Sequence, residues 1–367
     1  MDRRSFVGFG AASLAVLAVP GGAAEPGRLG ALLGGTRVDA EFVAWLESGG
    51  HGLAALPAEQ RGRTSHLLDA QLATVQALIA TGRYDERTGR RLHRLAASLA
   101  TTSGWHRFDQ GRHPAAERLW ELALQCAHRA GDRERGAGVL ADAAYQATWL
   151  GRPGTATARL DYALAAARHP TARALLLLRR ARAHAALGDP VACLRDLTAA
   201  ERALAAVSPD PAPAWCAWMG PADLAVDTGG CLLDLGRPVA ARTRIAEGLA
   251  QLPPARAKTR GIFLAYQART HLRTGEIDRA VAAGTESLDL AARIGAPRCT
   301  ALVRDLAPAF ARHRHLAGVP ELLDRLTPGR TVPGRTARTP GPGRTPRPDR
   351  TPRPDRASKP DRRNHGT

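Results

Sequence analysis

The sequence has few aromatic residues and few β-branched runs, and lysine and asparagine are nearly absent. Phenylalanine, tryptophan and tyrosine make up 4% of the 367 residues, whereas alanine and leucine dominate. No stretch shows the period-two alternation of polar and apolar residues that is typical of a half-buried strand. The composition therefore predicts an all-α protein.

Motifs of the common catalytic sites are missing as well. There is no GxxxxGK[ST] phosphate-binding loop, no HExxH metal-binding helix and no GxSxG nucleophile turn. Gly8-Phe9-Gly10 follows no predicted strand, so it is no dinucleotide-binding fingerprint. His313 and His315 would point in different directions on a helix, which disfavours a metal site. We therefore expect no enzymatic activity, no cofactor and no metal ion.

Cysteines are few and scattered singly, without a CxxC pair. The five are Cys126, Cys193, Cys216, Cys231 and Cys299. This spacing matches neither a zinc site nor a disulfide framework. We expect buried thiols at positions that call for a small side chain.

What the sequence does contain is a repeated unit, which is complete between Ser103 and Asp132. The stretch predicts two helices joined by a turn at Gly111-Arg112-His113. Pro114 then lies in the first turn of the second helix, where a missing N–H costs nothing. The second helix carries apolar residues at three- and four-residue spacing, namely Ala116, Leu119, Trp120, Ala123, Leu124 and Ala127. One such hairpin cannot bury its own apolar face, so it needs neighbours.

The same turn returns along the chain. Its glycines are Gly111, Gly151, Gly188, Gly236 and Gly275, at spacings of 40, 37, 48 and 39 residues. Five residues after each stands a small residue, namely Ala116, Ala156, Cys193, Ala241 or Ala280; four further on stand Trp120, Leu160, Leu197, Ile245 and Gly284. A small residue facing a large one lets two helices cross closely. The pattern resembles the tetratricopeptide repeat, whose period is about 34 residues, and predicts an α-solenoid of five to six hairpins.

The predicted helices follow from these turns. First helices are expected over Leu92–Gln110, Gly138–Leu150, Arg173–Leu187, Pro221–Leu235 and Arg260–Thr274. Second helices are expected over Pro114–Ala130, Thr155–Arg168, Pro190–Val207, Pro238–Leu252 and Asp278–Ile294. An irregular pair, Cys299–Ala311 and Val319–Leu326, would end the solenoid at residues 92–326. The proline-rich loop Ser208–Pro213 explains the widest spacing.

Residues 27–91 predict a helical cap that covers the first repeat. Its apolar stripes lie around Phe42 and around Leu72, and Gly49-Gly50-His51-Gly52 is expected to form a loop.

A stack of hairpins has a concave groove lined by its first helices. The residues expected there are Trp105, Phe108, Asp142, Tyr145, Trp149, Arg179, Arg182, Asp227, Tyr266 and Arg269. Aromatic rings beside arginines would suit an extended peptide that carries carboxylates. Alternatively, the aromatic side chains only fill the packing between repeats.

The first segment, residues 1–26, allows two interpretations. Arg3-Arg4, an apolar run to Val19 and the small residues up to Ala24 resemble a twin-arginine export signal that is cleaved near Ala24. The same run could form an apolar helix beneath the first repeat. It is too short for a transmembrane span, which needs roughly 20 residues.

The last segment, residues 327–367, differs in composition from the rest. It holds nine prolines and eleven Lys or Arg against three Asp, which gives it a net charge of +8 (11 − 3) within the total of +18. Such a segment predicts disorder. Its charge would attract nucleic acid or another anionic partner, although no aromatics are interleaved for base stacking.

A further resemblance extends over most of residues 1–326. It rests on Gly104-Trp105 with Asp109-Gln110-Gly111-Arg112, on Ala144-Tyr145-Gln146 with Leu150-Gly151-Arg152-Pro153, on Ala181-Arg182-Ala183-His184-Ala185, and on Gly230-Cys231-Leu232 with Leu235-Gly236-Arg237. These stretches resemble the sensor half of actinobacterial transcriptional regulators. In that family a helix-turn-helix domain precedes an Arg-Arg-containing apolar linker and tetratricopeptide repeats. No helix-turn-helix precedes Arg3-Arg4 here, so we expect a stand-alone repeat protein or a start codon further upstream.

Together these observations predict a cytoplasmic, non-enzymatic module that binds a protein or peptide in its groove. The resemblance implies a regulatory role in transcription, through a partner that contacts DNA. One alternative is a repeat protein exported by the twin-arginine route as a scaffold of the cell envelope. Another is a nucleic-acid-binding protein that uses its basic tail.

Overall fold

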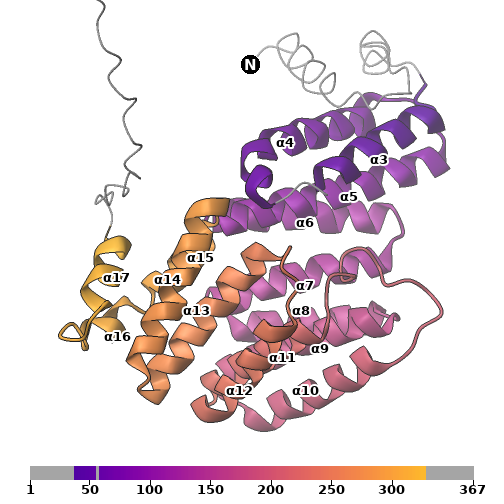
Figure 1. Cartoon of the computed structure of the whole chain (residues 1–367). Helices are drawn as coiled ribbons and strands as arrows, with labels where there is room; N and C mark the ends of the chain where they lie inside the picture. The colour runs from indigo at the N-terminus through magenta and orange to yellow at the C-terminus, as the bar shows by residue number, and fades with distance from the viewer. Residues whose placement is uncertain (1–36, 55–57, 328–367) are drawn as a thin grey trace, which may run out of the picture. The chain divides into compact units, whose positions relative to one another are not determined.

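The computed structural model describes residues 37–54 and 58–327, and these ranges form fifteen helices, α3 to α17 (Figure 1). Apart from one isolated bridge between Arg37 and Arg83, they contain no β-structure. The chain divides into a unit of residues 1–329 and a unit of residues 330–367, and every described residue belongs to the first. The predicted all-α class is confirmed. The predicted leader, and the predicted tail beyond Thr327, lie outside the described residues.

Two helices precede the repeats, α3 (Ala40–Ala54) and α4 (Ala58–Thr81). The predicted loop at Gly49–Gly52 is wrong, because α3 continues through it. Phe42, Val43 and Leu46 of α3 are buried, and the side-chain amide of Gln71 donates to the carbonyl of Leu46 at 2.6 Å. This packing outweighs the low helix propensity of the glycines.

Five helical hairpins follow. They are α5 (Glu86–Asp109) with α6 (His113–Arg129), α7 (Arg133–Trp149) with α8 (Pro153–Ala166), α9 (Pro170–Ala186) with α10 (Pro190–Ala205), α11 (Pro221–Asp234) with α12 (Pro238–Gln251), and α13 (Ala257–Thr274) with α14 (Ile277–Ile294). Each helix packs against its hairpin partner and against the next hairpin, and the first helices of successive hairpins lie side by side. The predicted α-solenoid of tetratricopeptide-like hairpins is therefore confirmed.

The first helix of the solenoid begins earlier than the sequence pattern predicts, at Glu86 instead of Leu92. Asp85 caps it, because its carboxylate accepts a hydrogen bond from the Thr88 N–H at 2.7 Å. The periodic apolar residues of α5 start only about one and a half turns after Glu86. The apolar pattern by itself therefore does not indicate where the helix begins.

The hairpin turns owe their shape to the five glycines that the sequence aligns. Each has a left-handed backbone, with φ between 70° and 78°. Glycine adopts this conformation without the steric cost that a Cβ atom adds. The turns therefore lie where the spacing predicts them, and proline follows closely in four of the five second helices.

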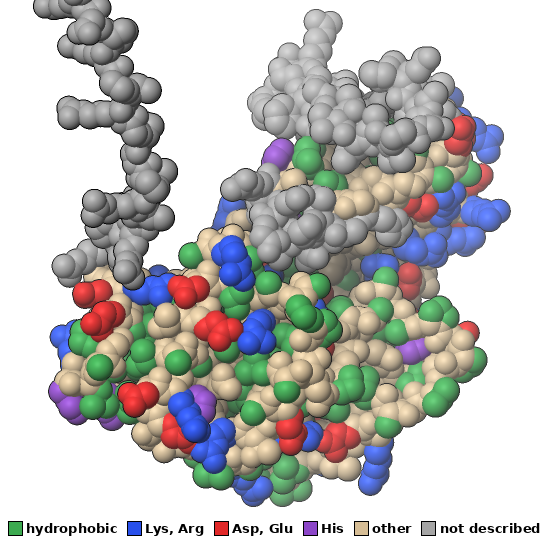
Figure 2. Space-filling view, in the orientation of Figure 1, with side chains coloured by type: hydrophobic (Ala, Val, Ile, Leu, Met, Phe, Trp, Pro, Cys, Tyr) green, Lys and Arg blue, Asp and Glu red, His purple; other side chains and the backbone are tan. Residues whose placement is uncertain are grey.

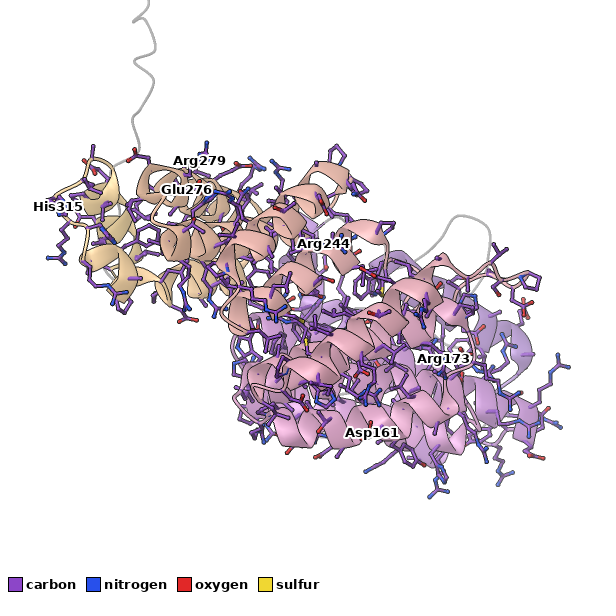
Figure 3. The ribbon with its side chains drawn as sticks, turned by 90° about the horizontal axis from the view of Figure 1, so that it is seen from below. Asp161, Arg173, Arg244, Glu276, Arg279 and His315 are labelled. Atoms are coloured by element: carbon purple, nitrogen blue, oxygen red, sulfur yellow. The ribbon has the colours of Figure 1, made fainter. Side chains whose placement is uncertain are left out.

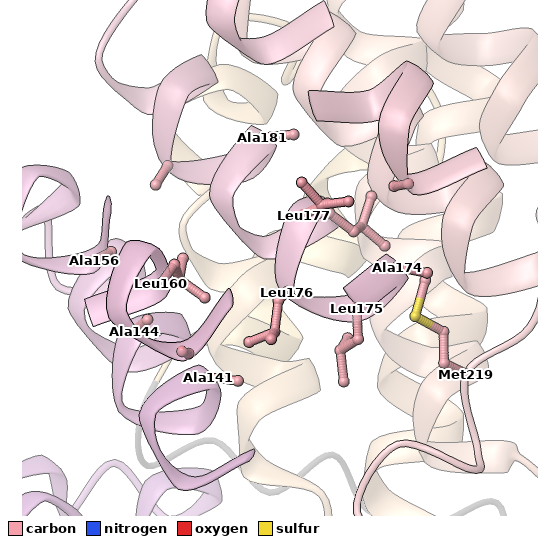
Figure 4. Close-up of a cluster of buried hydrophobic side chains, with 14 of the residues drawn as sticks. Ala141, Ala144, Ala156, Leu160, Ala174, Leu175, Leu176, Leu177, Ala181 and Met219 are labelled. Atoms are coloured by element: carbon pink, nitrogen blue, oxygen red, sulfur yellow. The ribbon is translucent and has the colours of Figure 1, made fainter. Parts of the chain in front are cut away.

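The small residues of the repeat pattern, and the large ones of the first four hairpins, lie on the buried faces of the second helices. Ala116, Ala156, Cys193, Ala241 and Ala280 have no exposed surface. Trp120, the large residue of the first hairpin, lies against Gly104 of α5, where a Cβ atom would come within 2.5 Å of its indole nitrogen. Figure 4 shows the corresponding packing around Leu160, with Ala144 and Ala156 beside it. This close approach is the reason that the repeat alternates small and large side chains.

The C-terminal end of the solenoid differs from the prediction. The expected helix Cys299–Ala311 is two helices, α15 (Pro297–Arg304) and α16 (Ala307–Ala311), followed by α17 (Val319–Leu326). Pro308 explains the break, because in a continuous helix it would lack the N–H that bonds to the carbonyl of Arg304. None of the described helices is both long and apolar enough to cross a membrane.

Candidate binding surface on the first helices

The residues expected to line the groove lie on α5, α7, α9, α11 and α13, the first helices of the five hairpins. We call them, together with Asp109, Asp234, Lys258 and Arg298, the inner cluster. The structure joins the members of this cluster by hydrogen bonds, ion pairs and ring contacts from one hairpin to the next. On the face of the molecule shown in Figure 2, by contrast, basic and acidic side chains are interspersed, and no patch of a single sign stands out.

Asp142 lies at the centre of the first half of the cluster. Its carboxylate accepts hydrogen bonds from Arg179 Nη1 at 2.7 Å and from Trp105 Nε1 at 2.8 Å. Burial raises the pKa of Asp142, while the charge of Arg179 opposes that rise. Arg179 is itself 6% exposed. The donors and acceptors of this group are therefore engaged with one another.

Four aromatic side chains from α5 and α7 pack around this group. Trp105, Phe108, Tyr145 and Trp149 have ring centroids between 5.5 and 5.8 Å apart in their direct contacts. Phe108 is 1% exposed and belongs to the core, whereas the other three rings are half-buried. The half-buried rings supply both packing and a surface that solvent reaches.

Arg298 of α15 is a cluster member that sequence reasoning missed. Its guanidinium carbon lies 5.2 to 5.9 Å from the centroids of all four rings. Its Nη1 lies 3.5 Å from Asp109 Oδ1, and Lys258 forms an ion pair with the same carboxylate. Arg298 lies outside the aligned repeats, so no periodic signal marks it. Only the approach of the last helices to the first hairpin reveals the contact.

The second half of the cluster is centred on Arg182 of α9. Its guanidinium lies 5.5 Å from the ring centroid of Tyr266, and Nη1 lies 3.7 Å from Asp234 Oδ2. Arg269 contacts the same carboxylate at 2.8 Å. Gly230 makes room for Arg182, because a Cβ atom there would come within 1.8 Å of Nη1. Burial raises the pKa of Asp227, which the charge of Arg182 opposes.

The five cysteines are all buried as free thiols, as the sequence predicts. Within residues 37–54 and 58–327, no group of three or more His, Cys, Asp or Glu side chains is placed to hold a metal ion.

Comparisons with known proteins identify no family for this chain. No protein-family model matches it, and no curated protein matches it. Among solved structures, the crystal structure of Rap protein complexed with competence and sporulation factor is similar with a TM-score of 0.49 at 13% sequence identity. The match covers 78% of this chain and 97% of that chain. A likeness of this extent assigns no function.

Proposed function

We propose that this chain is a non-enzymatic binding module that holds a protein segment or peptide against the inner cluster. The observation that supports this most directly is the combination of three half-buried rings, Trp105, Tyr145 and Trp149, with the buried Arg298 of α15, whose guanidinium lies within 5.9 Å of each ring centroid. Rings of this kind supply contact area to a ligand at low entropic cost, and arginines supply directional donors.

Binding to a peptide library displayed on phage tests the proposal. The full chain should select peptides, and Trp149→Ala should weaken the binding of a selected peptide by about tenfold or more, as removal of a buried aromatic contact does. Tyr162→Ala is the matched control, because Tyr162 is an aromatic residue of the second helix α8 and is 73% exposed. The proposal would be contradicted if both substitutions weakened binding equally, or if no peptide of the library bound to the full chain.

We further propose that the ligand belongs to a regulatory partner in transcription and that the chain acts in the cytoplasm. The resemblance to the sensor half of transcriptional regulators supports this role. Mass spectrometry of the N-terminus in the producing cell checks the location. An end at or near Met1 is expected, and an end just after Ala24 would instead support export.

A further inference from the structure

Two buried guanidinium groups of the inner cluster have hydrogen-bond donors without acceptors. Arg298 is 9% exposed, and its Nε and Nη1 atoms have no hydrogen-bond partner. Arg182 Nη1 also has no hydrogen-bond partner, and the Arg182 side chain is 18% exposed. A buried donor left without an acceptor costs about 1 to 3 kcal/mol, and more when it is charged. These donors therefore favour any acceptor that can reach them.

Two partly buried arginines outside the inner cluster, Arg256 and Arg180, have their donors engaged by carboxylates. Arg256 holds Asp223 in a two-pronged contact, with both nitrogen-to-oxygen distances at 2.8 Å, and stacks on Trp218. Arg180 holds Asp196 at 2.6 and 3.0 Å and also bonds to Asp161. Outside the inner cluster, Arg135 Nε is likewise without a hydrogen-bond partner. What sets Arg298 and Arg182 apart is that their unmatched donors lie beside aromatic rings of the cluster.

The charges of the cluster are also unequal. Five cationic side chains, Arg179, Arg182, Lys258, Arg269 and Arg298, face four carboxylates, Asp109, Asp142, Asp227 and Asp234. Lys258 binds Asp109 Oδ2, Arg179 binds Asp142, and Arg269 binds Asp234 Oδ1. Asp109 Oδ1 lies 3.5 Å from Arg298 Nη1, too far for a hydrogen bond, so Arg298 Nε and Nη1 still have no acceptor. One further carboxylate would balance the charge of these nine side chains. It would also give the unmatched donors of Arg298 and Arg182 an acceptor.

We propose that the inner cluster accepts a carboxylate of its ligand, with Arg298 as the principal donor and Arg182 as the second. This inference rests on the proposed function and names the ligand class, which is a peptide with an acidic group. A carboxylate matches the forked donors of a guanidinium. The half-buried Trp105, Tyr145 and Trp149 beside Arg298 would take the apolar part of the same ligand.

The same chemistry could come from a terminal carboxylate, an acidic side chain or a free dicarboxylate, and two experimental arms distinguish these sources. In the first arm, the full chain is titrated with succinate and with its neutral analogue succinamide, at constant ionic strength. Tryptophan fluorescence and the melting temperature are followed. Succinate should bind saturably and raise the melting temperature, whereas succinamide should do neither.

Three variants locate the response. Arg298→Gln should weaken succinate binding by about tenfold, which corresponds to one lost charge-assisted contact. Arg256→Gln, which removes an engaged arginine, should leave succinate binding unchanged. If Arg298→Gln loses its helical circular dichroism, Arg298→Lys is used in its place. Lysine keeps the positive charge but lacks the paired guanidinium donors, so succinate binding should still be weaker than in wild type. Equal succinate binding in wild type and the folded Arg298 variant would overturn the inference.

In the second arm, peptides selected by display are compared with their C-terminal amides and with their Glu→Gln and Asp→Asn versions. Loss of binding in the amide identifies a terminal carboxylate, and loss in the side-chain versions identifies an acidic residue. Peptides that bind equally in all versions would overturn the inference and leave the proposed function standing. Succinate binding without any peptide binding would support the carboxylate site and contradict the proposed function. No response in either arm would overturn both.

Discussion

Asp142 shows how one buried carboxylate ties three hairpins together. Its partners are Trp105 on α5 and Arg179 on α9. Asp142 on α7 therefore links the first hairpin to the third. Removing one member of a buried ion pair leaves the other charge without compensation, which is more costly than loss of the attraction alone. A structural role for Asp142 and Arg179 follows, although the sequence suggests both as ligand contacts.

We predict that Asp142→Asn lowers the free energy of unfolding by about 3 kcal/mol, because Arg179 keeps its buried charge without a counter-ion. Asp161→Asn is the matched control. Asp161, which is labelled in Figure 3, pairs with Arg180 at 2.6 Å. Its side chain is 62% exposed, so its loss should cost less than about 1 kcal/mol. Urea unfolding of both variants measures the difference. Equal losses would show that Asp142 is solvated like a surface residue.

His271 gives the fold a pH dependence. The residue is 6% exposed, and its Nδ1 lies 3.2 Å from a carboxylate oxygen of Glu276, which Figure 3 shows beside Arg279. Burial lowers the pKa of His271, against the opposing charge of Glu276. A histidine whose folded pKa lies below its unfolded value stabilises the fold above about pH 6.5, and this stability is lost as the pH falls.

We therefore predict that wild type loses more stability than His271→Gln between pH 7.5 and pH 5.5. The difference between their free energies of unfolding, measured in urea at each pH, should shrink as the pH falls. Titration of the His271 ring by NMR should give a pKa below the ordinary value near 6.5. A pKa above that value, with a difference that grows at low pH, would show that Glu276 outweighs burial.

At the scale of elements, the turn glycines carry the shape of the hairpins. We predict that Gly188→Ala costs about 1 kcal/mol, because alanine at φ 73° is strained. Gly154→Ala is the matched control, since Gly154 is helical and a Cβ atom there would meet nothing within 4 Å. That change should be neutral or stabilising. Thermal unfolding distinguishes the two, and equal melting temperatures would mean that the turn adapts.

The same scale explains what the sequence could predict. The turns and the second helices are encoded by local signals, such as Gly236 before Pro238, so their bounds are nearly correct. The course of α3 through Gly50 depends on packing against later helices, which local propensity cannot indicate. Within the candidate site, the members on the first helices follow the repeat, but Arg298 lies far along the chain from Asp109. The contact between Arg298 and Asp109 depends on how the hairpins pack, which no local sequence signal indicates.

At the scale of the described unit, contacts between the first and last hairpins distinguish this solenoid from a simple linear array. In a linear array each repeat contacts only its neighbours. Here Lys258 and Arg298, on α13 and α15, pair with Asp109 at the end of α5, and α14 contacts α4. Hairpins distant in sequence therefore support one another directly, and unfolding at one end removes contacts from the other.

We predict that this closure makes the unit unfold as a whole. Asp109→Ala should remove the shared counter-ion of Lys258 and Arg298, so that α13 to α17 exchange amide hydrogens faster than α7 to α10. Glu286→Ala is the control, because Glu286 pairs with Arg260 on the surface and joins no distant hairpins. Hydrogen exchange followed by mass spectrometry reads each helix separately. If Asp109→Ala accelerates exchange equally in all helices, the contact adds stability without coupling the ends. If it changes nothing, contacts other than the ion pairs of Asp109 hold the ends together, such as those of Arg298 with the rings of α5 and of α14 with α4.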